Sequence, residues 1–160
     1  MKPVIRPATK EDMPAVLELI KELAVFEKEP DAVIISAEDL IRDGFGENPS
    51  FKCFVAELEG KIQGMALIYF RYSTWKGKTV HLEDLIVREA YRGKGLGNAL
   101  YTKVIEYAEE AGVKRTEWVV LDWNTPAKEF YERSGATVFE DWCTVQMDEE
   151  AMKKFLSSKR

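Results

Sequence analysis

Three glycines at alternate positions lie within residues 92–98, together with one arginine and one lysine. The apolar, strand-like run 82–87 precedes them, and an amphipathic helical pattern follows them. Glycine lets the backbone approach a phosphate closely, and a helix start adds unpaired N–H groups and a positive partial charge. The segment therefore predicts an anion-binding turn, with Arg92 and Lys94 adding charge.

The glycine spacing by itself leaves the phosphate ligand open. The sequence contains no P-loop pattern, G-x-x-x-x-G-K-[ST]. The three glycines read G-x-G-x-G, and Asn98 stands where the dinucleotide pattern G-x-G-x-x-G has its last glycine. Glu117 and Asp122 lie near the position of the acid that this pattern requires. A dinucleotide-binding protein and a glycine turn without a ligand therefore remain as alternatives.

A second group that could do chemistry is the carboxylate pair Glu83 and Asp84, in the middle of the strand-like run 79–87. Two acids in a buried type of strand are costly unless they have a function. Consecutive strand residues point to opposite faces, so we expect one carboxylate on the substrate side and the other toward a helix layer or a partner subunit. The alternative is a pair that only caps or solvates the strand.

The elements that must position these groups follow from hydrophobic periodicity and from capping and turn residues. The expected strands are residues 4–6, 51–58, 62–70, 79–87, 117–121, 137–139 and 143–147. The expected helices are residues 13–24, 36–44, 98–111 and 126–135, followed by an amphipathic C-terminal tail. This order predicts an α+β protein with a mostly antiparallel first half and a β-α-β-α-β second half.

Composition narrows the class of protein. A length of 160 residues predicts a single domain, and a net charge of −5 argues against nucleic acid as a partner. No apolar run is long enough for a membrane span. Cys53 and Cys143 are expected in the core and do not form a disulfide framework, which predicts a cytoplasmic protein. The single histidine, His81, is expected on a strand surface, and no metal site is expected.

Several short blocks resemble the spermidine/spermine acetyltransferase family of the GNAT N-acetyltransferase superfamily. They are residues 5–8, 19–24, 43–46, 82–84, 91–93, 122–124 and 130–131, and the spacing Arg92-x-x-Gly95-x-Gly97 resembles the superfamily's pyrophosphate loop. The resemblance covers nearly the whole chain. It implies one GNAT domain, residues 1–160, with an α/β/α-like arrangement. Its central sheet would be mixed and mostly antiparallel, with about six to seven strands flanked by about four to five helices.

Acetyl transfer to an amine needs a neutral amine, and an amine with pKa about 10.4 is neutral in about one molecule in a thousand near pH 7.4. A base at the site is therefore useful. The resemblance implies that Glu83 is this base, acting through water, and that Asp84 lines the amine site. It also implies that Tyr131 donates a proton to the leaving CoA thiolate after direct attack in a ternary complex. Without the resemblance, Tyr131 would be interpreted as a core tyrosine.

The resemblance also implies which residues contact acetyl-CoA. They are Leu85, Ile86, Val87, Arg92, Gly93, Lys94, Gly95, Leu96, Gly97, Asn98, Asn124, Thr125, Pro126, Ala127 and Tyr131. A homodimer with sites near its interface is implied as well.

The segment 72–78 favours one type of amine. Polyamine-acetylating relatives carry an acid where Ser73 stands, whereas the thialysine-acetylating branch has a loop that resembles this one. Without an acid at position 73, and with Lys76 and Lys78 nearby, the segment suits a substrate with an α-carboxylate, as in an amino acid.

The expected substrate-binding residues are Glu27, Trp75, Glu83 and Asp84. The sequence thus predicts a thialysine Nε-acetyltransferase, with a polyamine acetyltransferase as the alternative. An acetyl-CoA-binding module without turnover is an alternative of a different class.

Overall fold

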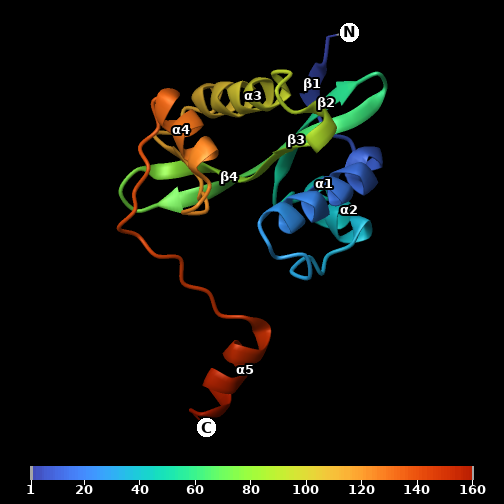
Figure 1. The fold of residues 1–160 in the computed structure, drawn as a ribbon. Helices are drawn as coiled ribbons and strands as arrows, with labels where there is room; N and C mark the ends of the chain where they lie inside the picture. The colour runs from blue at the N-terminus through green and yellow to red at the C-terminus, as the bar shows by residue number, and fades with distance from the viewer. Residues whose placement is uncertain (1, 160) are drawn as a thin grey trace. The chain divides into compact units, whose positions relative to one another are not determined.

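The computed structural model of the chain describes residues 2–159. It has two compact units, Met1–Val119 and Val120–Arg160, and each is described by itself. The first unit contains a mixed sheet with helices on both faces (Figure 1). The α+β class predicted from the sequence is therefore confirmed.

The sheet has the strand order β1-β2-β3-β4-β5. Its strands are β1 Val4–Pro7, β2 Lys52–Leu58, β3 Lys61–Ser73, β4 Gly77–Val87 and β5 Thr116–Glu117. The first four strands pair in antiparallel fashion, and β5 is parallel to β4. Within residues 2–159 the sheet therefore has five strands, fewer than the six to seven expected, while its mixed and mostly antiparallel character is confirmed.

The helices lie close to the predicted positions. They are α1 Met13–Phe26, α2 Ala37–Phe45 and α3 Leu96–Glu110 in the first unit, and α4 Thr125–Arg133 and α5 Glu149–Ser157 in the second. Two short 3₁₀ helices, η1 Lys10–Asp12 and η2 Glu89–Tyr91, complete the set. None of the helices within the described part of the chain combines the length and the apolar composition that a membrane span needs.

The two faces of the sheet carry different cores. Helices α1 and α2 pack on one face through Met13, Val16, Leu19, Leu40, Cys53, Val55, Met65, Leu67 and Ile86. Helix α3 covers the opposite face (Figure 1). The ring of Tyr107 contacts Phe54 and Phe70 there, at centroid distances of 5.8 and 6.0 Å. Gly64 lets α3 approach, because a Cβ at this position would lie 3.1 Å from Leu100 Cδ1. This packing places the N-terminus of α3 near the end of β4.

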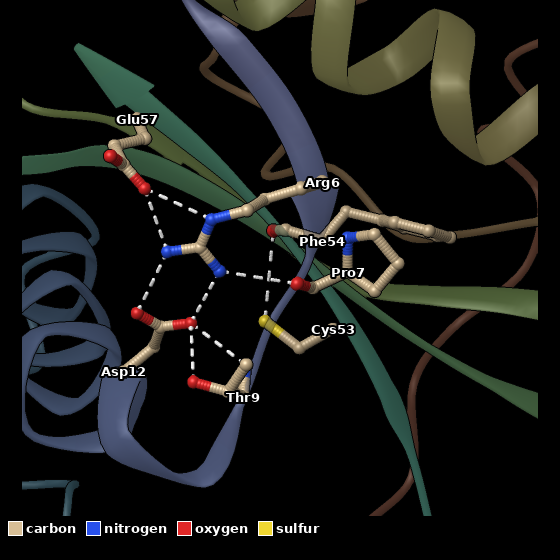
Figure 2. A network of polar contacts seen from close by, with 7 residues as sticks. All are labelled: Arg6, Pro7, Thr9, Asp12, Cys53, Phe54 and Glu57. Carbon is tan, nitrogen blue, oxygen red and sulfur yellow. Dashed lines mark hydrogen bonds and ion pairs between the residues drawn. The ribbon is translucent and has the colours of Figure 1, made fainter. Parts of the chain in front are cut away.

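A polar network ties the N-terminal strand to the first helix turn and to β2 (Figure 2). In this Arg6 network, Arg6 Nη1 lies 2.7 Å from Asp12 Oδ2, and Arg6 Nη2 lies 2.8 Å from Glu57 Oε2. The backbone N–H of Thr9 also donates to Asp12 Oδ2. Arg6 accordingly lowers the pKa of Asp12. Each carboxylate of the network thus has a cation beside it.

Three strand predictions for the last third of the chain are wrong. Only Glu117 of the expected strand 117–121 is in β5, and residues 137–139 and 143–147 form no strand. Their alternating apolar pattern suits a strand, but a strand also needs a neighbour to complete its hydrogen bonds. Val145 remains 91% exposed. Cys143 is exposed rather than in the core, whereas the prediction of a buried Cys53 is confirmed.

Candidate active site

The site begins with an irregularity in the pairing of β3 and β4. Ile68 pairs with Leu82 and Leu67 pairs with Asp84, so Glu83 is an extra residue in β4. This is a β-bulge, which interrupts the alternation of side chains along a strand. The rule that Glu83 and Asp84 must point to opposite faces therefore does not apply at this position.

The bulge brings both carboxylates to the same face of the sheet. Asp84 is paired with Leu67, which packs in the core beneath α1 and α2. Tyr69 lies two residues further along β3, hence on the same face, and its hydroxyl donates to Glu83 Oε2 at 3.2 Å. The predicted separation of Glu83 and Asp84 is thus wrong, and two adjacent acids share one side of the sheet.

A third carboxylate joins them from the end of α1. Glu27 follows the last residue of this helix and interacts electrostatically with Glu83 and Asp84. We call Glu27, Glu83 and Asp84 the acidic cluster. The ion pairs formed by residues 2–159 do not include Glu27 or Asp84. The structure therefore brings together three of the four residues predicted to bind the amine.

The electrostatics of the acidic cluster reflect this lack of a cation. Burial, together with the charges of Glu83 and Glu27, raises the pKa of Asp84 to about 6. Partial burial and the charge of Glu83 also raise the pKa of Glu27. A buried or like-charged carboxylate is destabilised in its ionised form, and a bound cation reverses this effect. The cluster is thus suited to an ammonium group.

Glu83 differs from the other two acids because hydrogen-bond donors hold it. His81 Nε2 lies 3.5 Å from Glu83 Oε2, and His81 is buried rather than on the strand surface as expected. The hydrogen bonds from His81 and Tyr69 lower the pKa of Glu83 against the opposing effect of burial. Its side chain is 52% exposed. Glu83 is therefore ionised near neutral pH and accessible to a proton donor.

Sequence analysis missed the roles of His81 and Tyr69 in holding Glu83. A signal for His81 was present, because residues two apart in a strand share a face and His81 precedes Glu83 by two. Tyr69 could be found only from the register of β3 against β4, which the sequence does not specify.

The glycine turn has the predicted strand–turn–helix geometry. β4 ends at Val87 and α3 begins at Leu96, with Gly95 as its N-cap residue. Gly93 and Gly95 have φ angles of 74° and 85°, which side chains disfavour. The first N–H groups of α3, among them those of Gly97 and Asn98, lack carbonyl partners within the helix.

The two cations of this turn are differently placed. Arg92 Nε donates to the carbonyl of Val87 at 2.9 Å, which fixes the side chain against the end of β4. Lys94 Nζ lies 5.0 Å from the ring centroid of Tyr91. The turn therefore offers backbone donors and positive charge together, and it can hold a phosphate group.

Residues 85–87 form the last part of β4. They pair with β3 on one side, whereas β5 pairs with β4 only at Val80 and His81. Leu85 is half-buried, and Ile86 and Val87 are buried. On the side away from β3, no β5 residue pairs with this part of β4, which leaves its main-chain edge suited to an extended ligand.

The remaining predicted cofactor residues lie in the second unit. Asn124 caps α4, where its Oδ1 accepts a hydrogen bond from the N–H of Ala127 at 3.4 Å. Thr125 and Pro126 form the first turn of this helix, and Tyr131 lies in its last third, half-buried. The capped start of α4 follows from the Asn-x-Pro order in the sequence.

The hairpin between β3 and β4 is tighter than expected. The strands continue to Ser73 and resume at Gly77, so the predicted loop 71–78 shrinks to a three-residue turn. Ser73 Oγ accepts hydrogen bonds from the N–H groups of Trp75 and Lys76, both at 3.1 Å. Trp75 is 78% exposed at the tip. Six residues of β4 separate the turn from Glu83, about 20 Å at the rise of a strand, so the structure does not bring Trp75 to the acidic cluster.

No group of three histidine, cysteine or acidic side chains among residues 2–159 is arranged to hold a metal ion. The groups of the candidate site that could take part in chemistry are the acidic cluster, its hydrogen-bond donors and the glycine turn.

We compared the chain with known protein families and with individual proteins. The sequence pattern of the acetyltransferase (GNAT) family matches residues 13–136. A thialysine N-epsilon-acetyltransferase of Sus scrofa is 42% identical over 162 residues, which cover 94% of this chain and 95% of that protein. A human spermidine/spermine N(1)-acetyltransferase-like protein is 40% identical over 82% of this chain and 20% of its own length.

Among solved structures, an integron cassette protein from the mobile metagenome of V. cholerae is similar in fold. Its TM-score is 0.79 at 22% identity, and the match covers 98% of each chain.

Proposed function

The chain belongs to the acetyltransferase (GNAT) family, and from this membership we propose that it transfers an acetyl group from acetyl-CoA to the distal amine of thialysine or a similar lysine-like amino acid. The observation that carries the proposal is the acidic cluster at the bulge of β4. Burial and the charge of Glu83 raise the pKa values of Glu27 and Asp84, and neither of these two carboxylates forms an ion pair within residues 2–159. Together with the ionised Glu83 they form a site suited to a positively charged amine.

The protonated amine enters between the carboxylates, where Glu27 and Asp84 hold its charge. Glu83 removes one proton, directly or through a water molecule, because it is ionised and accessible. The neutral nitrogen then forms a bond to the thioester carbonyl carbon, the bond from that carbon to sulfur breaks, and the nitrogen releases its second proton to solvent as the amide forms. Tyr131 supplies the proton that the departing thiolate takes up and regains a proton from solvent.

Acetyl-CoA binding is proposed at the start of α3. The positive φ angles of Gly93 and Gly95 and the anchored Arg92 suit a pyrophosphate, which a helix N-terminus also favours. The pantetheine arm runs along residues 85–87, whose outer edge β5 does not pair. In the second unit, residues 124–127 and Tyr131 are the proposed further contacts.

The choice of thialysine rests on two independent supports. The relative from Sus scrofa, alike over nearly the full length of both chains, is a thialysine N-epsilon-acetyltransferase. Ser73 places no carboxylate in the hairpin turn, which leaves fewer acids for a second or third ammonium group. Polyamines remain the second candidate, because three clustered carboxylates also suit a multiply charged amine and the human relative carries spermidine/spermine in its name.

We further propose that residues 1–160 act as one catalytic domain, that the enzyme is a cytoplasmic homodimer, and that residues of the second unit contribute to the dimer interface. Phe139, Trp142 and Val145 are large apolar side chains that are mostly exposed within one chain. Exposed apolar side chains of this size are common at subunit interfaces.

The test is free-CoA release from acetyl-CoA with thialysine, lysine, spermidine and spermine measured side by side. We expect the highest kcat/KM with thialysine. A higher kcat/KM with spermidine than with thialysine would support the acetyltransferase activity but reject the proposed preference for thialysine. Tight CoA binding by calorimetry without turnover of any amine would indicate a binding module. NAD(H) binding without acetyl-CoA binding would indicate a dinucleotide protein and reject the proposal.

A further inference from the structure

We propose that His81 is a positioning residue for Glu83: its neutral ring donates an Nε2–H hydrogen bond to Glu83 Oε2 and leaves Oε1 for the attacking amine. The role of this bond in catalysis rests on the proposed function, in which Glu83 is the base. The bond itself, and the tautomer that it requires, rest on the geometry of the hairpin alone.

The imidazole ring has little freedom to move. The side chain of His81 is only 9% exposed, although histidine on a strand is often at the surface. Its backbone pairs with Tyr69 of β3 on one side and with Glu117 of β5 on the other. The ring of Tyr69 packs against it at a centroid distance of 5.1 Å and an interplanar angle of 35°. Packing from two neighbouring strands therefore fixes the direction of both ring nitrogens.

The partner of the other nitrogen determines the tautomer. His81 Nδ1 lies 3.5 Å from Arg71 Nη1. A guanidinium group only donates hydrogen bonds, so Nδ1 must accept and the proton of the neutral ring must be on Nε2. Nε2 lies 3.5 Å from Glu83 Oε2, which can only accept when ionised. Both distances are at the long end for hydrogen bonds, as is common for catalytic contacts before substrate binds.

Arg71 is held in this position by an acid of its own. Its Nη1 lies 2.9 Å from Glu117 Oε1, and Glu117 Oε2 lies 3.4 Å from Arg115 Nε. A guanidinium has no acceptor atom, so its contact with Nδ1 is a hydrogen bond only in the tautomer with the proton on Nε2.

Two donors converge on one oxygen of Glu83. Tyr69 Oη and His81 Nε2 both lie beside Oε2, at 3.2 and 3.5 Å. Burial and the charge of Glu83 raise the pKa of Tyr69, so its hydroxyl keeps its proton and remains a donor. On the other side, Glu27 and Asp84 face Glu83 as like charges.

A half-exposed glutamate would otherwise populate several rotamers. The two donors restrict it to one, and this restriction presents Oε1 to a bound ammonium group.

The tautomer can be tested without any measurement of activity. His81 is the only histidine of the chain, so the ring ¹⁵N spectrum of tag-free protein contains the signals of a single imidazole. We expect a protonated Nε2 and an unprotonated Nδ1 at pH 8. Arg71→Met should allow both tautomers to be populated. A protonated Nδ1 in the wild-type chain, or a tautomer that does not respond to Arg71→Met, would overturn the proposal.

The positioning role is tested by kinetics. His81→Phe keeps a buried ring and removes the donor, and we expect kcat to fall about tenfold with the amine KM changed less than about twofold. The acidic limb of the kcat–pH profile should move to higher pH, because Glu83 loses a donor that stabilises its ionised form. His81→Gln, which keeps an N–H donor, should recover part of the loss.

Tyr69→Phe should shift the same limb, whereas Tyr107→Phe, on the opposite face of the sheet, should not. A role in stability alone would lower Tm in His81→Phe and leave the pH profile in place, which would refute positioning. If the wild-type protein releases no CoA with any amine, the proposed function fails. The ¹⁵N spectrum then still decides whether the hydrogen bond exists.

Discussion

The Arg6 network and the acidic cluster each gather carboxylates from separate elements of the first unit, but only the Arg6 network contains a cation. Arg6 lies between two carboxylates and lowers the pKa of Asp12. In the acidic cluster, burial and like charges raise the pKa of Asp84 to about 6. The carboxylates of the Arg6 network have a cation of the protein beside them, whereas the acidic cluster is the site that we propose for a positively charged amine.

We therefore interpret the Arg6 network as a group that stabilises the fold, and the acidic cluster as part of the proposed amine site. Carboxylates with a partner of their own make the folded state more stable at neutral pH. Carboxylates held close together without a partner make it less stable, and a ligand that binds them recovers this free energy. A variant should therefore change stability in one cluster and activity in the other.

Glu83→Gln should have the largest effect on activity. Gln cannot take a proton from the amine, and general bases contribute about 10²- to 10⁴-fold, so we expect kcat/KM to fall by at least about 100-fold. Free-CoA release with thialysine measures this. The matched control is Glu57→Gln in the Arg6 network, which should leave kcat/KM per folded molecule unchanged. Equal losses in both variants would show that the two clusters do not differ in function.

Asp84→Asn should raise stability and lower amine affinity. Because its folded pKa of about 6 lies above the unfolded value of 3.8, Asp84 makes the protein less stable as pH rises from about 4 to 6, and the loss persists above pH 6. At pH 7.5 the substitution should add up to about 3 kcal/mol to the free energy of unfolding. The amine KM should rise about tenfold.

Urea unfolding at pH 4 and pH 7.5 separates these effects, since the gain should nearly vanish at pH 4. The control Asp12→Asn should have the opposite sign. The folded pKa of Asp12 is lowered, so its contribution is present at neutral pH and is lost as pH falls below the unfolded value through the folded one. Destabilisation by Asp84→Asn at pH 7.5 would contradict the proposed strain.

Arg6→Met should destabilise the fold without affecting the chemistry. The substitution leaves Asp12, whose side chain is only 12% exposed, without its charged partner. Loss of hydrogen bonds to a largely buried charge costs about 2 kcal/mol. Thermal and urea unfolding measure this cost, and kcat per folded molecule should stay the same. Arg42→Met removes an arginine from an exposed pair with Asp39 and should have a much smaller effect. Similar losses in the free energy of unfolding in both variants would show that the Arg6 network stabilises the fold no more than an exposed ion pair does.

Local signals predicted most of the fold. Ser36 and Asp39 form the reciprocal capping bonds that their spacing indicates, and the periodic run of α1 packs as expected. Strand pairing in the last third was not predictable in this way, because residues 143–147 have the right pattern but no neighbour. A residue pattern indicates the conformation that one segment favours, whereas the hydrogen bonds of a β-sheet require a second strand beside it.

In the candidate site, too, features set by contiguous residues were predicted, and features set by strand pairing were not. The glycine turn depends on contiguous residues, and its strand–turn–helix geometry was predicted. The bulge at Glu83 depends on the register between β3 and β4, which no local pattern encodes. The bulge brings Glu83 and Asp84 to the same face of the sheet, so both carboxylates belong to the acidic cluster. Tyr69 was missed for the same reason, whereas the spacing of His81 from Glu83 was a local signal that was not used.

Ser73→Asp should have the smallest effect, and it tests how far the acidic cluster extends in function. An aspartate can accept the same turn hydrogen bonds as Ser73, so the hairpin should keep its shape. At about 20 Å in water, a new charge changes the energy of an ammonium in the cluster by only about 0.2 kcal/mol. Thialysine kcat/KM should therefore change less than about twofold.

Spermine, the longest of the four amines, can place a remote ammonium near the turn, where a contact at about 4 Å contributes about 1 kcal/mol. We expect its kcat/KM to rise about fivefold. Ser50→Asp, an added acid on a loop before β2, is the control for a general increase in negative charge. If spermine turnover is unchanged by Ser73→Asp, residue 73 does not select the amine, and the acidic cluster alone must distinguish an amino acid from a polyamine.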